Sequence, residues 1–387
     1  MTDSLRVALV GLGVRAELAE HVPANDAQIV ACVDPHPRGL ADAAARFGPS
    51  VALHTDHRAL RRDDVDAALV LSPDDTHESI AVDLLRAGIA TFVEKPLAIT
   101  TEGADRVLAA ARDAGSRLYV GHNLRHAPFA IAMSDIIESG AIGRVTSVWC
   151  RHFVGHGGDF FFKDWHADRR RTTSLLLQKG AHDIDVMHWL AGAPAVAVSA
   201  FGELGVYGAL ADRADGDRPG PLMTDWYDEA VWPAEAQRGL HPVIDVEDLS
   251  VVNLQLANGV LATYQQCHYT PDYWRNYTVI GTRGRLENFG DLDGAVIRVW
   301  NARRSGFRAD ADVEIEIPAE GGTHGGADPA IIAEFLRFAR EGGATKTSPV
   351  AARDAVAAGF AATSSLRAGG QLVDVPPLDP ELARYFS

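Results

Sequence analysis

Short apolar runs and amphipathic helical patterns alternate through the first third of the chain. The apolar runs are short enough for buried strands and cover residues 5–10, 29–33, 67–71, 89–93 and 117–120. The helical patterns lie between them, are each followed by a glycine, and cover residues 37–47, 74–87 and 101–114. Alternation of strands and helices at this spacing predicts a parallel, doubly wound sheet.

The pattern changes after residue 123. Residues 249–257 and 260–268 alternate between apolar and polar side chains, and the Asn258-Gly259 pair between them is typical of a hairpin turn. Residues 144–153 predict a long strand, and residues 277–287 a second hairpin. Helical patterns follow the first third at residues 126–139, from 182 onward, and at 330–340 and 350–367. Long antiparallel strands with a few helices predict an α+β domain built on one open sheet.

A glycine-rich turn follows the first predicted strand. Residues 11–16 read Gly-Leu-Gly-Val-Arg-Ala, the G-x-G-x-x-A pattern of a dinucleotide-binding turn. Gly11 permits the tight turn, and Gly13 lets the backbone approach a pyrophosphate at the start of the next helix. Asp34 ends the second strand, about 20 residues further on, where a carboxylate binds the adenosine ribose hydroxyls. It could also cap the helix that starts near Pro35.

These features predict an α/β chain with two domains. We expect a Rossmann dinucleotide-binding domain over residues 1–123 and an α+β domain for substrate binding and oligomerisation over residues 124–387. The carboxylate of Asp34 repels a 2′-phosphate, so NAD is favoured over NADP, although Arg38 lies close enough to soften that preference. The large, open, mostly antiparallel sheet leaves one face to be covered, so we expect a homodimer or homotetramer.

Chemically useful residues follow the predicted strands of the first domain. Ser72-Pro73, Glu94-Lys95-Pro96 and Gly121-His122-Asn123 each come directly after a strand. Ligands bind at the carboxyl ends of such strands, so we expect all three segments on one edge of the sheet. Pro96 restricts the backbone of Lys95, one of only four lysines in the chain. Taken alone, the segment around Lys95 is more typical of a surface turn.

The second domain contains a helical segment that begins with a histidine. Within residues 175–190, His182 lies near the start of a pattern that continues to Leu190. A histidine titrates near neutral pH and can act as an acid or a base, but it can also be a hydrogen-bonded structural residue. No cluster of residues has the spacing of metal ligands, so we predict no metal site.

Two loops are rich in aromatic side chains. Residues 203–243 break the strand pattern and contain Trp226, Tyr227 and Trp232, which suits a lid, a subunit contact or a disordered excursion. Residues 159–171 combine aromatic side chains with three consecutive arginines. That combination suits binding of a sugar or sugar acid, or a packed loop with solvated charges.

Composition excludes several classes of protein. The 387 residues carry a net charge of −16, which argues against a nucleic-acid or anionic-membrane partner because both need a basic surface. Three widely separated cysteines indicate a reducing compartment without a disulfide framework. The sequence starts without a signal-peptide pattern and contains no long apolar run, so we expect a cytoplasmic protein that acts on a small molecule.

Together these motifs resemble those of a known family. The glycine-rich turn, Glu94-Lys95-Pro96, Gly121-His122-Asn123 and Gly180-x-His182-x-x-Asp185-x-x-x-Trp189 look like those of the Gfo/Idh/MocA oxidoreductases, the glucose–fructose oxidoreductase and inositol dehydrogenase group. The resemblance covers essentially the whole chain. It implies a Rossmann domain, a second domain with a large open sheet, and nicotinamide-dependent oxidation or reduction of a sugar, cyclitol or related polyol.

The resemblance also implies roles for individual residues. Lys95 matches the family lysine near the reacting hydroxyl, and His182 matches the acid/base histidine. The candidate cofactor contacts are Gly11, Gly13, Val14, Arg15, Asp34, Arg38, Ser72, Pro73, His77, Glu94, Lys95 and Asn123. The candidate substrate contacts are Asn123, Arg125, Trp165, His166, Gln178, Lys179, Asp185 and His268.

One position departs from the family pattern. Many members carry an aspartate four residues before the histidine, where this chain has Gln178. Without that carboxylate the tautomer and pKa of His182 are less obviously set. Asp185, three residues along the helix, could substitute, or Lys179 could reshape the site.

The resulting hypothesis is a dehydrogenase that uses NAD. His182 exchanges a proton with a secondary hydroxyl or ketone, and Lys95 polarises its oxygen. One alternative is an NAD-dependent glycoside hydrolase that works by transient ring oxidation and elimination. Another is a non-catalytic nucleotide sensor, in which Lys95 or His182 would be expected to be missing. Loops, rather than the fold class, set the substrate and the carbon that reacts.

Overall fold

The computed structural model describes residues 4–215, 227–318 and 323–386. The chain separates into two compact units. The first contains Met1–Asn123, Asp328–Val356 and Leu378–Ser387, and the second contains Leu124–Ala327 and Ala357–Pro377. The sequence analysis instead places both of these C-terminal segments of the first unit in the second domain.

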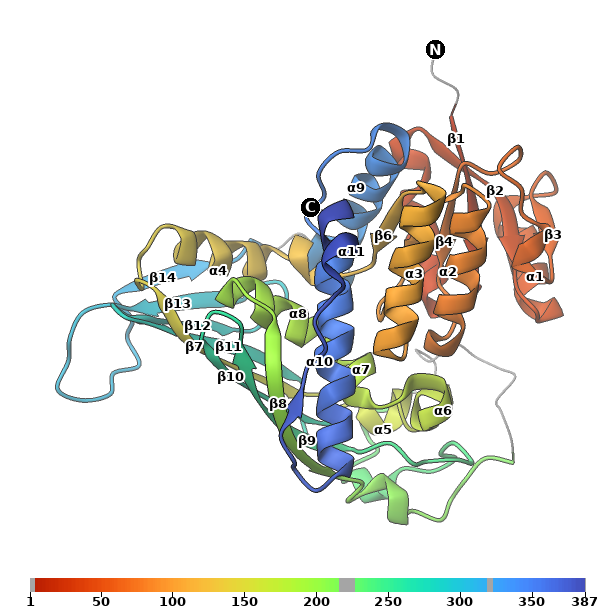
Figure 1. Cartoon of the computed structure of the whole chain (residues 1–387). Helices are drawn as coiled ribbons and strands as arrows, with labels where there is room; N and C mark the ends of the chain where they lie inside the picture. Colours follow the sequence, from red (N-terminus) through yellow and green to blue (C-terminus); the bar gives the residue numbers. More distant parts are fainter. Residues whose placement is uncertain (1–3, 216–226, 319–322, 387) are drawn as a thin grey trace. The chain divides into compact units, whose positions relative to one another are not determined.

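The first unit is built on a six-stranded parallel sheet (Figure 1). Its strand order is β3-β2-β1-β4-β5-β6. Strands β2 and β3 lie on one side of β1 and strands β4 to β6 on the other, as in a Rossmann sheet. The strands are β1 (Leu5–Val10), β2 (Ala27–Val33), β3 (Ala52–His54), β4 (Ala67–Val70), β5 (Ala90–Val93) and β6 (Leu118–Val120). Of these, β3 is the one that the sequence pattern did not predict.

The helices of the first unit follow local end signals. Thr100 accepts a hydrogen bond from the Gly103 backbone N–H and starts α3, which ends at Gly115 with a φ of 61°. The helices are α1 (Pro37–Phe47), α2 (His77–Arg86), α3 (Thr101–Ala114), α9 (Ala327–Glu341), the first part of α10 (Pro349–Arg367) and α11 (Pro380–Tyr385). The segment after the glycine-rich turn is a 3₁₀ helix, η1 (Val14–His21).

Helix α9 belongs to the first unit because of its apolar stripe. Ile331, Ile332, Phe335 and Leu336 are buried in the same cluster as the strand residues of one sheet face. The Phe335 ring lies 5.5 Å from the Phe92 ring on β5. Sequence periodicity predicts such a stripe, but it does not say which sheet the stripe will cover.

The second unit contains a nine-stranded mixed sheet (Figure 1). Its order is β14-β13-β12-β11-β7-β10-β9-β8-β15, with β7 and β10 parallel and the other neighbours antiparallel. The strands are β7 (Val145–Phe153), β8 (Ala195–Glu203), β9 (Leu249–Leu256), β10 (Leu261–Cys267), β11 (Trp274–Gly281), β12 (Arg285–Phe289), β13 (Val296–Trp300), β14 (Val313–Glu316) and β15 (Val373–Asp374).

One face of this sheet is covered and the other is open. The helices of the second unit are α4 (Pro128–Glu138), α5 (Gly157–Phe160), α6 (Arg169–Thr172), α7 (Leu175–Gln178), α8 (Gly180–Ala191) and the rest of α10. Helix α8 is buried on almost every side and packs on β7 and β10. Alternation along β9, buried at Val252 and Leu254 and exposed between them, marks the covered face.

The irregular stretch at 203–243 starts where β8 ends. Its described residues include the short 3₁₀ turns η7 (Tyr207–Ala209) and η9 (Ala234–Ala236). The side chain of Asp248 fixes its beginning by accepting hydrogen bonds from the backbone N–H groups of Gly205, Val206 and Tyr207. Residues 216–226, including Trp226, lie outside the described residues. No described helix is both long and apolar enough to cross a membrane.

Candidate active site

The glycine-rich turn and Asp34 come together at the carboxyl ends of β1 and β2. Gly11 has a φ of 93°, and a Cβ there would lie 2.6 Å from the Ser72 backbone nitrogen. A Cβ on Gly13 would meet nothing within 4 Å. One Asp34 oxygen accepts a hydrogen bond from the Leu12 N–H at 2.9 Å, and the other accepts one from the His36 N–H at 2.8 Å. Asp34 therefore fixes both the turn and the start of the next segment.

His77 joins two of the predicted loops. Its Nδ1 lies 2.7 Å from the Pro96 carbonyl oxygen, and its Nε2 lies 2.8 Å from the Ser72 carbonyl oxygen. Burial lowers the pKa of this imidazole. The predicted cofactor contact thus also has a structural role, because its ring lies between the loop after β4 and the loop that carries Lys95.

Lys95 is the second residue after β5 and is half-buried, and its peptide bond to Pro96 is cis. Beside it, Glu94 accepts a hydrogen bond from Arg15 Nε at 2.7 Å. The Arg15 guanidinium also pairs with Asp328 at 3.1 Å, and Asp328 accepts a hydrogen bond from Asn123 Nδ2 at 2.9 Å. Burial opposes the charge of Arg15, but Glu94 and Asp328 outweigh it and raise the pKa of the guanidinium.

This group of residues forms what we call the nucleotide edge, the carboxyl ends of β1, β2, β4, β5 and β6. The residues present fit a dinucleotide: the backbone at Gly13 is open, and a carboxylate stands at the end of β2. The sequence analysis missed Asp328, which binds two of the predicted residues. The Asp-Pro pair at the start of a helix is the only sequence signal for this residue. Its contacts with Arg15 and Asn123 each span more than 200 residues of the chain, and local sequence patterns do not reveal contacts over such distances.

His182 lies in the first turn of α8 and is buried. Three residues on, Asp185 binds Arg125 with both oxygens, at 2.7 and 2.8 Å from Nε and Nη2. The same guanidinium stacks over the Trp189 ring at 5.4 Å. Two predicted substrate residues, Arg125 and Asp185, therefore bind each other. This contact gives no support to the idea that Asp185 replaces the aspartate that many family members carry at the position of Gln178.

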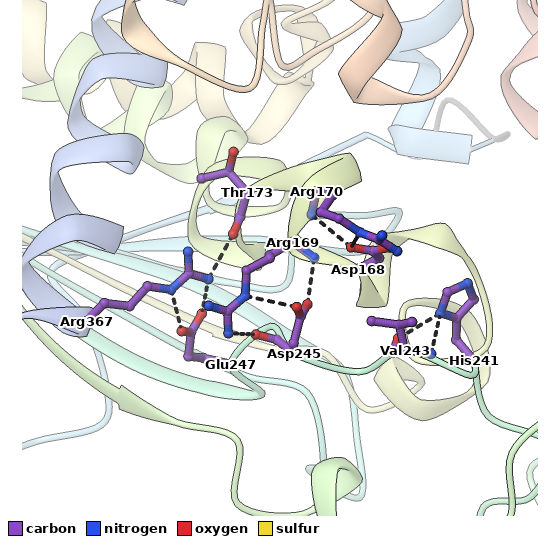
Figure 2. A network of polar contacts seen from close by, with 9 residues as sticks. All are labelled: Asp168, Arg169, Arg170, Thr173, His241, Val243, Asp245, Glu247 and Arg367. Carbon is purple, nitrogen blue, oxygen red and sulfur yellow. Dashed lines mark hydrogen bonds and ion pairs between the residues drawn. The ribbon is translucent and has the colours of Figure 1, made fainter.

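The segment that leads into α8 is held by a network of charged side chains (Figure 2). Arg169 binds Asp245 through its backbone N–H and its guanidinium, and Arg367 binds both Glu247 and the Thr173 carbonyl oxygen. Thr173 has a φ of 66° and a ψ of −60°, an unfavourable conformation for a β-branched residue. The short helix α7 begins two residues after Thr173 and ends at Gln178, and Lys179 follows it. The strained turn therefore lies just upstream of the predicted site.

Aromatic rings surround the remaining candidates in the second unit. The His166 ring stacks on Trp165 at 3.7 Å and lies edge-on to Phe161, and Lys179 Nζ lies 5.5 Å from the Phe161 ring. His268 follows β10, is fully buried beside Phe161, and has no hydrogen-bond partner for either ring nitrogen among the described residues. Burial lowers the pKa of His268 well below its usual value, so its imidazole is neutral.

Comparison with known proteins agrees with both halves of the fold. Residues 5–122 match the model of an oxidoreductase family with an NAD-binding Rossmann fold, and residues 131–287 match the Gfo/Idh/MocA C-terminal domain. The chain belongs to the Gfo/Idh/MocA oxidoreductase family. Its first unit is accordingly an NAD-binding Rossmann domain, as predicted.

Individual relatives resemble this chain over different shares of its length. A Bacillus subtilis protein named as an oxidoreductase, YteT, is 25% identical over 352 residues, 80% of this chain and 82% of its own. Inositol 2-dehydrogenase 2 of Saccharopolyspora erythraea is 31% identical over 203 residues, 51% of this chain and 57% of its own. The chain thus aligns with little more than half of that relative.

A solved structure shows the same fold. Levoglucosan dehydrogenase, in complex with NADH and levoglucosan, superposes with a TM-score of 0.75 at 22% identity and covers 96% of this chain and 100% of its own. The alternative of an NAD-dependent glycoside hydrolase has no support from these comparisons. Among the described residues, no three His, Cys, Asp or Glu side chains gather as a metal site.

Proposed function

We propose that the protein is an NAD-dependent dehydrogenase that acts on a secondary hydroxyl, or the corresponding ketone, of a sugar, cyclitol or sugar derivative. Bound NAD would supply the hydride acceptor in one direction and the donor in the other. Gly11, Gly13 and Asp34 would hold its pyrophosphate and ribose. The chain's own contribution is to position the substrate and to manage its proton and charge.

Lys95 and His182 have different roles in this proposal. The ammonium group of Lys95 donates a hydrogen bond to the substrate oxygen and stabilises the negative charge that develops there. The imidazole of His182 takes the hydroxyl proton during oxidation and returns it during reduction. Histidine suits both directions because its ordinary pKa lies near neutral pH.

The observation that supports the proposal most is the place of Lys95 on the nucleotide edge. It is the second residue after β5, the His77 ring lies between its loop and the loop after β4, and its neighbour Glu94 binds Arg15 of the glycine-rich turn. A lysine fixed to the same edge as the dinucleotide turn is suited to act on a group that reacts beside the cofactor.

The substrate class is inferred from two sources. Relatives named as inositol 2-dehydrogenase and a structural neighbour named levoglucosan dehydrogenase indicate polyhydroxylated rings. The aromatic side chains around Lys179, including Phe161, Trp165 and His166, would suit the apolar face of such a ring. Sugar acids belong in the same class because Lys179 carries a positive charge.

A substrate screen tests this function. Purified protein is incubated with NAD or NADP and a panel of sugars, cyclitols and sugar acids, and NADH absorbance and product are measured together. We expect at least one substrate to yield NADH and ketone in equal amounts, with NAD preferred. Conversion of a glycoside without net NADH, or no NADH from any of the panel, would contradict the dehydrogenase.

We also propose that the protein is a homodimer or homotetramer formed through the open face of the second sheet. Exposed apolar residues lie on that face in neighbouring strands: Trp149 is 41% exposed, Leu261 60% and Ile280 45%. Light scattering should give a dimer or tetramer, and the double variant Trp149→Glu, Ile280→Glu should give a smaller species. A wild-type monomer would refute this part of the proposal.

A further inference from the structure

A buried carboxylate lies next to His182 and faces the sheet. Asp183 is fully buried, and its Oδ2 lies 2.7 Å from His152 Nδ1 and 2.8 Å from the Tyr264 hydroxyl. Its Oδ1 accepts a hydrogen bond from the Tyr277 hydroxyl at 2.6 Å and lies 3.1 Å from Arg275 Nε. We call these five residues the Asp183 cluster.

The cluster collects side chains from three adjacent strands. His152 on β7 pairs in register with Arg275 on β11, and Tyr264 on β10 and Tyr277 on β11 flank Cys150 one step along the same face. One carboxylate of α8 thereby binds β7, β10 and β11 at once. Because its contacts lie on three different strands, this carboxylate restrains α8 from rotating or sliding on the sheet.

The charges within the cluster are consistent with this arrangement. Burial alone would raise the pKa of Asp183, but the charge of Arg275 and the hydrogen bonds from His152 and Tyr277 outweigh it and lower that pKa, so the carboxylate is ionised. Burial, with Arg275 beside it, lowers the pKa of His152 to about 4, so the imidazole is neutral. Since an ionised carboxylate can only accept, the His152 proton lies on Nδ1. Arg275 also binds Asp291 at 2.9 Å.

A close approach of α8 to the sheet makes these contacts possible. A Cβ on Gly180, the first residue of α8, would lie 3.2 Å from Cε1 of Tyr264. A larger residue would push the first turn away from β10, and Asp183 with it. The glycine two residues before His182 is therefore explained by packing.

A buried ionic network is weak evidence of a gain in stability. Desolvating the charges is costly, and well-packed apolar residues are often as stable or more so. The most direct result of this network is a fixed geometry for the first turn of α8, where His182 also lies.

We propose that Asp183 is a positioning residue for the reaction: it anchors the first turn of α8 to the sheet and so fixes the imidazole of His182. This inference rests on the proposed function, in which His182 is the acid/base. Asp183 faces the sheet and touches neither substrate nor cofactor in this account. Its loss should lower turnover while leaving substrate and NAD binding largely intact.

The main variant for the test is Asp183→Asn, which keeps the shape but turns an amide toward several hydrogen-bond donors. At a temperature where the variant is folded, we expect kcat to fall about 10- to 100-fold, as for a displaced catalytic group, with KM and NAD affinity nearly unchanged. Tyr264→Phe and Tyr277→Phe each remove one hydroxyl without changing the ring, and should lower kcat by smaller factors.

A matched control separates positioning from stability. Asp66 accepts a hydrogen bond from the Arg6 backbone N–H at 2.9 Å and pairs with its guanidinium at 3.0 Å, and it precedes β4 at the sheet edge opposite the nucleotide edge. Asp66→Asn should lower thermal stability without lowering kcat. If Asp183→Asn behaves like Asp66→Asn, or fails to fold while both Tyr→Phe variants keep wild-type kcat, the positioning role is overturned.

A readout that needs no activity separates this inference from the proposed function. The ring Cε1–Hε1 NMR signal of His182, assigned with His182→Gln, should shift or broaden in Asp183→Asn and stay in place in Asp66→Asn. An unmoved signal would refute positioning even in an active enzyme. If the wild type produces no NADH but the signal moves, the proposed function fails and the anchoring of His182 stands.

Discussion

The nucleotide edge and the Asp183 cluster place functional side chains by different means. On the nucleotide edge, Gly11, Asp34 and Lys95 each lie within two residues of the end of a strand, so their location follows from parallel strand order. In the Asp183 cluster, residues 31 to 123 positions apart meet in the buried layer between a helix and a sheet. The first arrangement depends on backbone turns, and the second on long-range packing of charges.

This difference predicts different sensitivities. Substitutions on the nucleotide edge should alter cofactor binding or chemistry with limited effects on folding, unless they touch a turn that only glycine can make. Substitutions in the second unit's buried polar layer should alter stability and geometry together, because they leave buried polar groups without partners.

The largest expected effect is a loss of turnover, and it concerns one residue on the nucleotide edge and one beside the Asp183 cluster. Lys95→Ala and His182→Ala should each lower turnover by on the order of 10²–10⁴, typical of lost oxyanion or acid/base help. NAD affinity should remain, because neither residue belongs to the glycine-rich turn. Steady-state kinetics and NAD titration measure both, and near-wild-type turnover in either variant would remove that residue from the mechanism.

The two glycines of the turn sharpen the comparison within the nucleotide edge. Gly13→Val should keep the wild-type melting temperature because nothing lies within 4 Å of its Cβ, yet weaken NAD binding roughly 10- to 100-fold by blocking the approach of the pyrophosphate. Gly11→Ala should lower stability, since its Cβ would clash with Ser72 and its φ is 93°. Calorimetry measures the stability of both variants, and NAD titration measures their affinity. A loss of stability in Gly13→Val with unchanged NAD affinity, or an unchanged stability in Gly11→Ala, would contradict these roles.

Acid should destabilise the second unit through buried histidines. Burial lowers the pKa of His152 and of His188 to about 4, and His188 Nε2 accepts a hydrogen bond from the Ala195 N–H. The unfolded chain, with a histidine pKa of about 6.5, binds more protons between these values, so stability is full above pH of about 6.5 and falls by roughly 3 kcal/mol per histidine as pH drops to about 4.

Urea unfolding at several pH values measures this effect. His152→Gln, which keeps a donor for Asp183, should reduce the slope between these pH values by the contribution of one histidine, because other buried imidazoles such as His156 and His268 also have lowered pKa values. A wild-type unfolding midpoint that stays constant over this range would show that these histidines are not held neutral in the folded protein.

The smallest expected effect concerns the strained turn before α7. Thr173→Gly should relieve a conformation that costs about 1–3 kcal/mol, against roughly 0.5–1 kcal/mol of added chain entropy, for a net gain near 1 kcal/mol. Arg367→Met, which loses its contacts with Glu247 and the Thr173 carbonyl, should destabilise the protein. A loss of stability in Thr173→Gly would indicate that the threonine side chain matters more than its backbone strain.

The sequence predicts the nucleotide edge well because its signals are local. Helices at 37–47 and 101–114 and the strand at 5–10 match α1, α3 and β1 to the residue. The family and the NAD-binding domain are confirmed as well. The roles of Lys95 and His182 stay predictions.

The contacts that the sequence did not reveal are between distant residues. Asp183 stands beside the predicted His182, but its partners lie on β7, β10 and β11, and only the strand register brings them to one face. Asp328 meets Arg15 because α9 packs on the first sheet, which periodicity alone does not specify. Strands β8, β13 and β14 were not predicted, since their sequences lack hairpin signals as clear as Asn258-Gly259.

The most direct test of the account is a crystal structure with NAD and a substrate identified by the screen. We predict that Lys95 Nζ and a ring nitrogen of His182 both lie within about 2.6–3.2 Å of the oxygen that reacts. A substrate oxygen held by other groups, with either of these side chains turned away from it, would contradict the account.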